Sequence, residues 1–172
     1  MADLIDPWAS FSLDYDKLIN EFGIGKISDM IDDVKNPQRL MKRGVIFGHR
    51  EFNEINNLIN QKKDFAVVTG MMPSGQMHIG HKMVVDQLKW YQDMGAMLSL
   101  PIADLEAYAA RDMSFEKGRE IAVNEYLTNW IALGLDLVIS VQMLNRPSHW
   151  IIIDIFHMFF VILTIPDNVV EE

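Results

Sequence analysis

The stretch that decides the fold of this chain reads Pro73-Ser74-Gly75-Gln76-Met77-His78-Ile79-Gly80-His81. It follows an apolar run at residues 65–69, which has the pattern of a buried strand in a parallel sheet. Glycine and proline are dense after that run, at Gly70, Pro73, Gly75 and Gly80. A loop of this composition adopts unusual backbone angles and lets a ligand approach the main chain closely. The sequence thus predicts a strand followed by a ligand-binding loop.

A helix is predicted directly after this loop. Apolar side chains recur there at helical spacing, in a stripe made of Val84, Leu88 and Tyr91 and widened by Met83, Val85 and Met94. His78 and His81 therefore lie at or near a helix N-terminus, where free amide N–H groups and the helix dipole favour an anion such as phosphate. Their imidazoles point the same way and are suited to donate hydrogen bonds to phosphate oxygens.

The histidines also raise the question of a metal site. The pair at His78 and His81 lacks a third ligand nearby, and the chain has no cysteine, so we predict no bound metal. The three other histidines are interpreted as ordinary surface or core residues: His49, His149 and His157.

A second segment that carries chemistry is the strand-like run at residues 98–108, which contains two carboxylates, Asp104 and Glu106. At the end of a strand, the two-residue period turns both side chains to the same side. Ligands of open α/β sheets bind outside the carboxyl ends of the strands, so these acids are candidate substrate contacts. The alternative is a pair of solvated loop acids.

The pattern beyond this segment is again helical. Ser114 is suited to cap a helix that ends at Gly134 and whose apolar side chains include Val123, Leu127 and Trp130. Strands and helices thus alternate over residues 65–135, which predicts an α/β fold with a parallel sheet. Nearer the N-terminus, residues 14–22 predict a short helix and residues 45–47 a strand or hairpin arm.

Composition sets further bounds on the class of protein. A chain of 172 residues is long enough for one domain with a sizeable core. The lack of cysteine excludes disulfides and, with no N-terminal signal pattern, fits a cytoplasmic location. A formal net charge of -9 argues against nonspecific affinity for nucleic acid, so a nucleic-acid partner would need a local basic patch.

Together these motifs resemble the class I aminoacyl-tRNA synthetases. The four residues His78-Ile79-Gly80-His81 spell the first signature of that class, HIGH, and the preceding Pro-Ser-Gly resembles its tryptophanyl and tyrosyl branch. The flanking segments resemble the N-terminal part of archaeal tryptophanyl enzymes: Asp6-Pro7-Trp8, residues 14–18, Glu21-Phe22-Gly23, Asn36-Pro37, Leu40-Met41 and residues 43–50. The similarity runs from about Asp6 to Asp136.

The resemblance implies a Rossmann-like catalytic domain that uses ATP with Mg²⁺ to activate tryptophan and transfers it to tRNA(Trp), in an enzyme that is a homodimer. It implies catalytic roles for His78 and His81, and ATP contacts from Pro73, Ser74, Gly75, His78, Gly80 and His81. Either Asp104 or Glu106 would receive the indole N–H. Residues 1–60 would pack over the catalytic domain, with Arg43, His49 and Arg50 either near the nucleotide or on the surface.

Three residues depart from the pattern of eukaryotic and many archaeal tryptophanyl enzymes. Val68 and Pro101 stand where those relatives carry a Tyr and a Gln that touch the substrate, and Met71 stands in place of a loop Arg. A tyrosyl-tRNA synthetase-like enzyme is therefore the first alternative to a tryptophanyl one.

The last part of the chain breaks the pattern. We expect an N-terminal extension at residues 1–60, the first half of the catalytic domain at 61–136, and an anomalous apolar tail at 137–172, in which no KMSKS signature follows. Residues 150–165 are almost wholly apolar but short for a membrane span. A genuine buried element, including a parallel strand at 137–141, is a second explanation. We favour a third, a shift of reading frame soon after Asp136, which would make this a truncated synthetase; an inactive or membrane-associated fragment is the further alternative.

Overall fold

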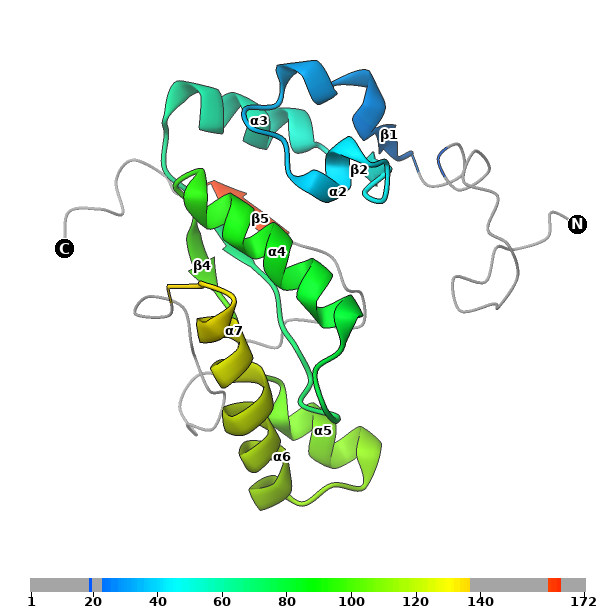
Figure 1. Cartoon of the computed structure of the whole chain (residues 1–172), viewed down its shortest axis with the longest axis vertical. Coiled ribbons are helices and arrows are strands. Elements are labelled where there is room, and N and C mark those ends of the chain that lie inside the picture. The colour runs from blue at the N-terminus through cyan, green and yellow to red at the C-terminus, as the bar shows by residue number, and fades with distance from the viewer. Residues whose placement is uncertain (1–18, 20–22, 137–160, 165–172) are drawn as a thin grey trace, which may run out of the picture. The chain divides into compact units, whose positions relative to one another are not determined.

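The computed structural model describes residue 19, residues 23–136 and residues 161–164. The chain divides into two compact units, Met1–Gln61 and Lys62–Glu172, which are taken here one at a time (Figure 1). The short helix expected at residues 14–22 lies outside the described residues, except for Ile19, which is helical.

The first unit is built from short elements around a small apolar core. Strand β1 (Gly25–Lys26) pairs antiparallel with β2 (Gly48–His49). Between them lie two 3-10 turns, η1 (Ile27–Asp29) and η2 (Ile31–Asp33), and helix α2 (Arg39–Lys42). Helix α3 (Phe52–Gln61) completes the unit. The buried side chains that form the core are Ile27, Val34, Leu40, Met41, Phe52, Ile55 and Ile59.

The strand in the first unit is not where the sequence predicted it. Residues 45–47 form no strand, and β2 begins only at Gly48. The backbone N–H groups of Val45 and Ile46 both donate to the carbonyl of Leu40, at 3.0 and 3.2 Å. The apolar run is thus turned back onto the end of α2, and Val45 is 49% exposed. The prediction of a strand at these residues was wrong because local helix-end hydrogen bonds hold them.

The second unit contains the predicted strand, loop and helix. Strand β3 (Phe65–Val68) is buried, and helix α4 (Ile79–Asp93) follows the loop. Strand β4 (Met97–Ser99) lies parallel to β3, with Val67 opposite Leu98. The α/β fold and the parallel pairing predicted from the alternating pattern are therefore confirmed. Phe65 of β3 meets Tyr91 of α4 edge to face at 6.5 Å between ring centroids, so α4 packs on the sheet.

A third strand makes the sheet mixed, with both parallel and antiparallel pairs. Strand β5 (Val161–Thr164) pairs with β3 on the side away from β4, giving the order β4-β3-β5, and runs antiparallel to β3. A continued β-α alternation would have placed a parallel strand beside β3. The candidate parallel strand at residues 137–141 lies outside the described residues.

The helices after β4 follow one another closely in space and sequence. Helix α5 (Asp104–Arg111) precedes a continuous rod made of α6 (Phe115–Ile121), a π-helical turn (Ala122–Leu127) and α7 (Thr128–Ala132) (Figure 1). The predicted cap is present, because the Ser114 hydroxyl accepts the backbone N–H of Lys117 at 3.2 Å. Gly134, with a φ of +90°, ends the rod as predicted.

The π-helical turn was not predicted, and it changes which side chains are buried. The Thr128 hydroxyl donates to the carbonyl of Val123 at 2.9 Å and fills the widened turn. Val123, placed in the apolar stripe by the sequence, is 40% exposed, so that assignment was wrong. Trp130 is fully buried, as predicted, and so is Tyr126, which was not assigned to the stripe. Among the described residues no helix is both long and apolar enough to cross a bilayer.

Candidate nucleotide site

The site lies where β3 and β4 end. Pairing continues past both strands, since Thr69 donates its backbone N–H to the Ser99 carbonyl at 3.2 Å and Met71 donates to the Pro101 carbonyl at 3.2 Å. The N–H of Ala103 then donates back to the carbonyl of Met71 at 3.0 Å. The loop before α4 and the start of α5 are therefore held side by side at the carboxyl end of the sheet, which is where ligands of open α/β sheets bind.

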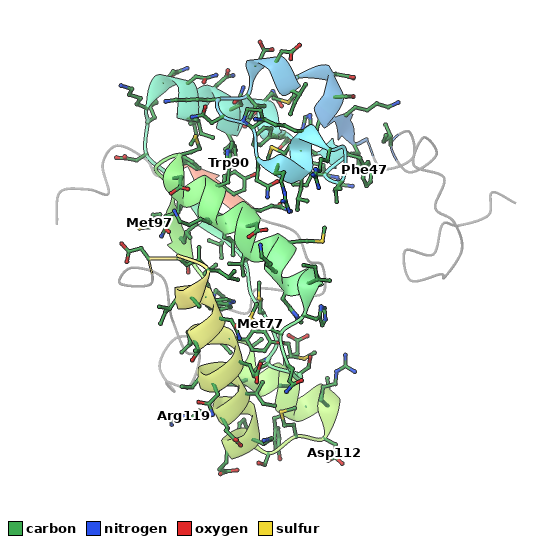
Figure 2. All side chains as sticks on the ribbon, in the orientation of Figure 1. Phe47, Met77, Trp90, Met97, Asp112 and Arg119 are labelled. Carbon is green, nitrogen blue, oxygen red and sulfur yellow. The ribbon has the colours of Figure 1, made fainter. Side chains whose placement is uncertain are left out.

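Two histidines form the cap of helix α4. His78 is the N-cap residue, and its Nδ1 accepts the backbone N–H of Gly80 at 3.2 Å. In return, Nδ1 of His81 accepts the backbone N–H of His78 at 3.2 Å. This is a capping box made by two imidazoles, whose ring centroids are 4.0 Å apart. Met77, labelled in Figure 2, immediately precedes the pair on the loop.

The capping contacts decide which nitrogen of each ring carries the proton. Because Nδ1 accepts a backbone hydrogen bond in both rings, each neutral imidazole holds its proton at Nε2. Burial lowers the pKa of His81 below its ordinary value of 6.5, and the charge of His78 lowers it further. His81 is therefore neutral near pH 7. The helix N-terminus thus presents two Nε2–H donors beside its own free amide groups, an arrangement suited to phosphate.

The small residues of the loop differ in their surroundings. A Cβ on Gly80 would lie 3.0 Å from Cε1 and 3.1 Å from Nδ1 of His78, so glycine is needed here for the histidine ring itself. Gly75 has open space around its Cα, and Pro73 is fully buried. Ser74 is exposed, and its backbone N–H donates to the Met72 carbonyl at 2.8 Å.

The structure adds a residue that the sequence reasoning missed. Tyr126, from the π-helical turn, places its hydroxyl 3.4 Å from Nε2 of His81, with the two rings edge to face at 5.4 Å between centroids. Burial raises the pKa of Tyr126, while hydrogen bonds from the side chain and backbone of Ser74 lower it and the charge of Glu125 raises it. The sequence reasoning placed Leu127 in the apolar stripe and left Tyr126 out, although Ala122, Tyr126 and Trp130 recur at helical spacing and are all buried.

The two acids are placed differently from the prediction. Asp104 and Glu106 both lie in the first turn of α5 and not on a strand end. Successive residues of a helix are rotated by about 100°, so side chains two positions apart do not share a face. The prediction that they point to the same side was therefore wrong. Both are partly exposed, and Oδ1 of Asp104 accepts the backbone N–H of Leu105 at 2.9 Å.

The remaining candidate, His49, has a local structural role in the first unit. Its Nδ1 accepts the backbone N–H of Phe52 at 3.2 Å and so caps α3, and its ring lies edge to face with Phe52. Burial lowers the pKa of His49, and Asp29 acts in the opposite direction. Arg43 and Arg50 belong to the same unit. Within residues 23–136 and 161–164, no group of three His, Asp or Glu side chains is arranged to hold a metal ion.

A parallel β-α-β unit whose first loop ends in a helix N-terminus with paired donors is the arrangement of a Rossmann-like nucleotide-binding domain. Comparison with known proteins narrows this class. The profile of the family described as tRNA synthetases class I (W and Y) matches residues 60–160. The chain belongs to this family, and the resemblance predicted from its motifs is confirmed.

Individual relatives agree with the family profile. The tryptophan–tRNA ligase of Methanocaldococcus jannaschii is 53% identical over 133 residues, which are 77% of this chain and 36% of that protein. The corresponding ligase of Methanosarcina acetivorans is 46% identical over 135 residues, 78% of this chain and 31% of that one. This chain therefore spans about a third of the length of the curated relatives that it matches.

Solved structures show the same relationship. The tryptophanyl-tRNA synthetase of Aeropyrum pernix superposes with a TM-score of 0.72 at 42% identity, covering 84% of this chain and 41% of that one. A tryptophanyl-tRNA synthetase from Encephalitozoon cuniculi, described as bound to tryptophan, gives a TM-score of 0.61 at 30% identity, covering 73% and 39%. The Rossmann-like class I fold predicted from the sequence is thus confirmed.

Proposed function

We propose that this chain supplies the nucleotide-binding half of a tryptophan–tRNA ligase. The observation that carries the proposal is the reciprocal capping of α4 by His78 and His81, which leaves the exposed Nε2–H of His78 as a donor at a helix N-terminus. The names of the relatives support tryptophan as the amino acid, ahead of the tyrosine alternative that the family description also covers.

In the first step, a carboxylate oxygen of tryptophan attacks the α-phosphorus of ATP. The new bond joins that oxygen to the α-phosphorus, the bond from the α-phosphorus to its bridging oxygen breaks, and pyrophosphate leaves. Negative charge grows on the phosphoryl oxygens, so fixed donors at this point lower the barrier by electrostatic stabilisation. We assign this role to the Nε2–H of His78. His81 acts beside it, since its Nδ1 accepts the backbone N–H of His78 and its Nε2 lies 3.4 Å from the Tyr126 hydroxyl.

The loop before α4 is assigned to the rest of ATP. Pro73, Ser74 and Gly75 lie at the carboxyl end of β3, and Gly80 lets the His78 ring pack against the first turn of α4. Mg²⁺ is proposed to arrive with ATP, bound by the phosphate oxygens, since this cation is commonly held by substrate phosphates.

An acid of α5 is assigned to the indole N–H of tryptophan. Asp104 already accepts the backbone N–H of Leu105, whereas Glu106 lies two positions after Asp104 in the same first turn. We therefore favour Glu106 as the acceptor and keep Asp104 as the alternative. A buried acceptor of this kind rejects an amino acid that lacks the matching donor, because the carboxylate is then left unpaired.

The second step belongs to the complete enzyme. A ribose hydroxyl of tRNA(Trp) attacks the activated carbonyl of tryptophan, and AMP leaves. We propose that the complete enzyme is a cytoplasmic homodimer, as the resemblance implies. These assignments rest on the family and on relatives that are more than twice as long as this chain.

Equilibrium dialysis of labelled amino acids against the 172-residue chain tests the proposal. With Mg²⁺-ATP present, tryptophan should be retained in preference to tyrosine, and a Glu106→Gln variant should lose this preference. Tyrosine retained as well as tryptophan contradicts the choice of substrate, and no retention of either contradicts the site.

A further inference from the structure

The hydroxyl of the buried residue Tyr126 has no role in the proposed chemistry, yet it lies 3.4 Å from Nε2 of His81. The side chain is fully buried, and its ring packs edge to face between His81 and Trp130, at centroid distances of 5.4 and 6.3 Å. A buried phenol normally has a hydrogen-bond partner, because desolvating the hydroxyl without one is costly. Here the partners are His81 and Ser74, the first on α4 and the second on the loop before it.

We propose that Tyr126 is a positioning residue of the nucleotide site, which fixes the imidazole of His81 at the start of α4. This inference rests on the proposed function and adds to it a residue outside the signature. The Tyr126 hydroxyl is 3.4 Å from Nε2 of His81, and Nδ1 of the same ring accepts the His78 N–H at 3.2 Å. The ring is therefore held at both nitrogens, and its rotation is restricted before ATP arrives.

The contact also separates the roles of the two histidines. His81 is half-buried and engaged at both nitrogens, whereas His78 is exposed and engaged at Nδ1 by Gly80. Since Nδ1 of His81 accepts, its Nε2–H donates to the phenol oxygen. Tyr126 thus holds the second ring, and the first lies tilted against it at 4.0 Å between centroids.

The π-helical turn explains how Tyr126 reaches this position. The Thr128 hydroxyl and the Asn129 amide donate to the carbonyls of Val123 and Glu125, which stabilises backbone groups in the widened turn. Single π turns inside helices are common at functional sites. In this rod the turn directs Tyr126, and not Val123, into the protein.

The variant Tyr126→Phe tests the proposal, because it removes the hydroxyl and keeps the ring. The matched control is Tyr108→Phe, which makes the same change at a tyrosine that is 52% exposed and stacked on Phe115. The ¹⁵N signals of the His81 ring, assigned with His81→Asn, report its tautomer and hydrogen bonding. Calorimetric titration with Mg²⁺-ATP reports affinity.

We expect Tyr126→Phe to shift the Nε2 signal of His81 and to weaken ATP binding about threefold to tenfold, as expected for one lost hydrogen bond. Tyr108→Phe should change neither. Unchanged His81 signals overturn the proposal, and so does unchanged ATP affinity. In the wild-type chain, an Nδ1–H tautomer of His81 overturns it without any variant. A wild-type chain that binds no ATP contradicts the proposed function, while the ring signals still decide whether Tyr126 positions His81.

Discussion

His78 and His81 together cap the N-terminus of helix α4. The ring of His78 accepts from Gly80 and the ring of His81 accepts from His78, and the two centroids lie 4.0 Å apart. Histidine is an unusual cap, because short side chains such as Ser, Asp and Asn ordinarily take this position. The gain is that both rings are held with the proton on the far nitrogen, which is exposed in His78 and lies beside the Tyr126 hydroxyl in His81.

The close fit of Gly80 against His78 gives the first prediction. In Gly80→Ala the new Cβ would lie 3.0 Å from the His78 ring, so the ring must turn away from its capping position. We expect ATP affinity to fall about tenfold or more, roughly 1.4 kcal/mol, in calorimetric titration. The control is Gly118→Ala on α6, whose Cβ would make an ordinary 3.8 Å contact with Met113. Equal affinities in the two variants would contradict the role of Gly80.

The second prediction concerns pH and stability. Burial holds the pKa of His81 and of His49 below the ordinary value of 6.5. The unfolded chain therefore binds protons at a higher pH than the folded chain does. The contribution of these two histidines to the free energy of unfolding should be constant above pH 6.5, the ordinary pKa that they have in the unfolded chain. It should decrease as the pH falls from 6.5 toward their lower pKa values in the folded chain.

Urea denaturation at pH 7.5 and pH 5.5 measures this dependence. Replacing His81 by Asn should remove its share of the change between the two pH values, and replacing His49 by Asn should remove the other share. A wild-type chain that is more stable at pH 5.5 than at pH 7.5 would contradict this prediction, because other titrating groups would then contribute more to the pH dependence of stability than the two histidines do.

The third prediction concerns the π-helical turn. Thr128→Val keeps the shape of the side chain but loses the hydroxyl that donates to the Val123 carbonyl. We expect a loss of about 0.5–1.5 kcal/mol in the free energy of unfolding. Because the turn places Tyr126, the His81 ring signals should shift as well. Thr128→Ser retains a donor and should behave more like the wild type; a Val variant with wild-type stability and signals argues against this account of the turn.

The fourth prediction separates the two acids of α5. Glu106→Gln should weaken tryptophan binding strongly, by as much as a hundredfold if the carboxylate is buried against the indole N–H. Asp104→Asn should weaken it less, since this side chain contacts the start of its own helix. Dialysis with labelled tryptophan in the presence of Mg²⁺-ATP measures both. The reverse order of effects would assign the indole to Asp104.

The elements that the sequence predicted well are those determined by local pattern. The apolar run of β3, the stripe of α4 and the cap at Ser114 each depend on neighbours within a few residues. The failures depend on the surrounding fold. The run at residues 45–47 is turned back by Leu40, and the acid segment enters a helix once Ala103 has bonded to Met71.

The same distinction holds within the candidate site. His78, Gly80 and His81 form a contiguous motif, and their position at the start of α4 follows from the helical stripe behind them. Tyr126 lies 45 residues from His81 in sequence. Its four-residue spacing to Trp130 is compatible with burial on one helix face, but periodicity does not say which distant segment that face meets, so the contact with His81 required the structure.

The origin of residues 137–172 stays a prediction. The antiparallel pairing of β5 with β3 departs from a continued β-α alternation and supports the frame-shift hypothesis. The family profile, however, matches as far as residue 160, which argues against a frame shift immediately after Asp136. Translation of the coding DNA from codon 130 onward in all frames decides the question. A KMSKS-like loop in another frame supports the shift, and its presence in the same frame or in none contradicts it.

The most direct test of the central claim is calorimetric titration of Mg²⁺-ATP into the 172-residue chain and its His78→Asn variant. Asparagine can still cap α4 through its Oδ1, but its shorter side chain places no N–H where Nε2 of His78 lies, so the helix is retained and the donor is withdrawn from that position. Lys89→Gln, which removes a positive charge paired with Asp93 at the other end of α4, is the matched control. We predict binding by the wild type and by Lys89→Gln, and binding about tenfold weaker for His78→Asn. Equal affinity in all three proteins would contradict the assignment of the histidine pair to ATP.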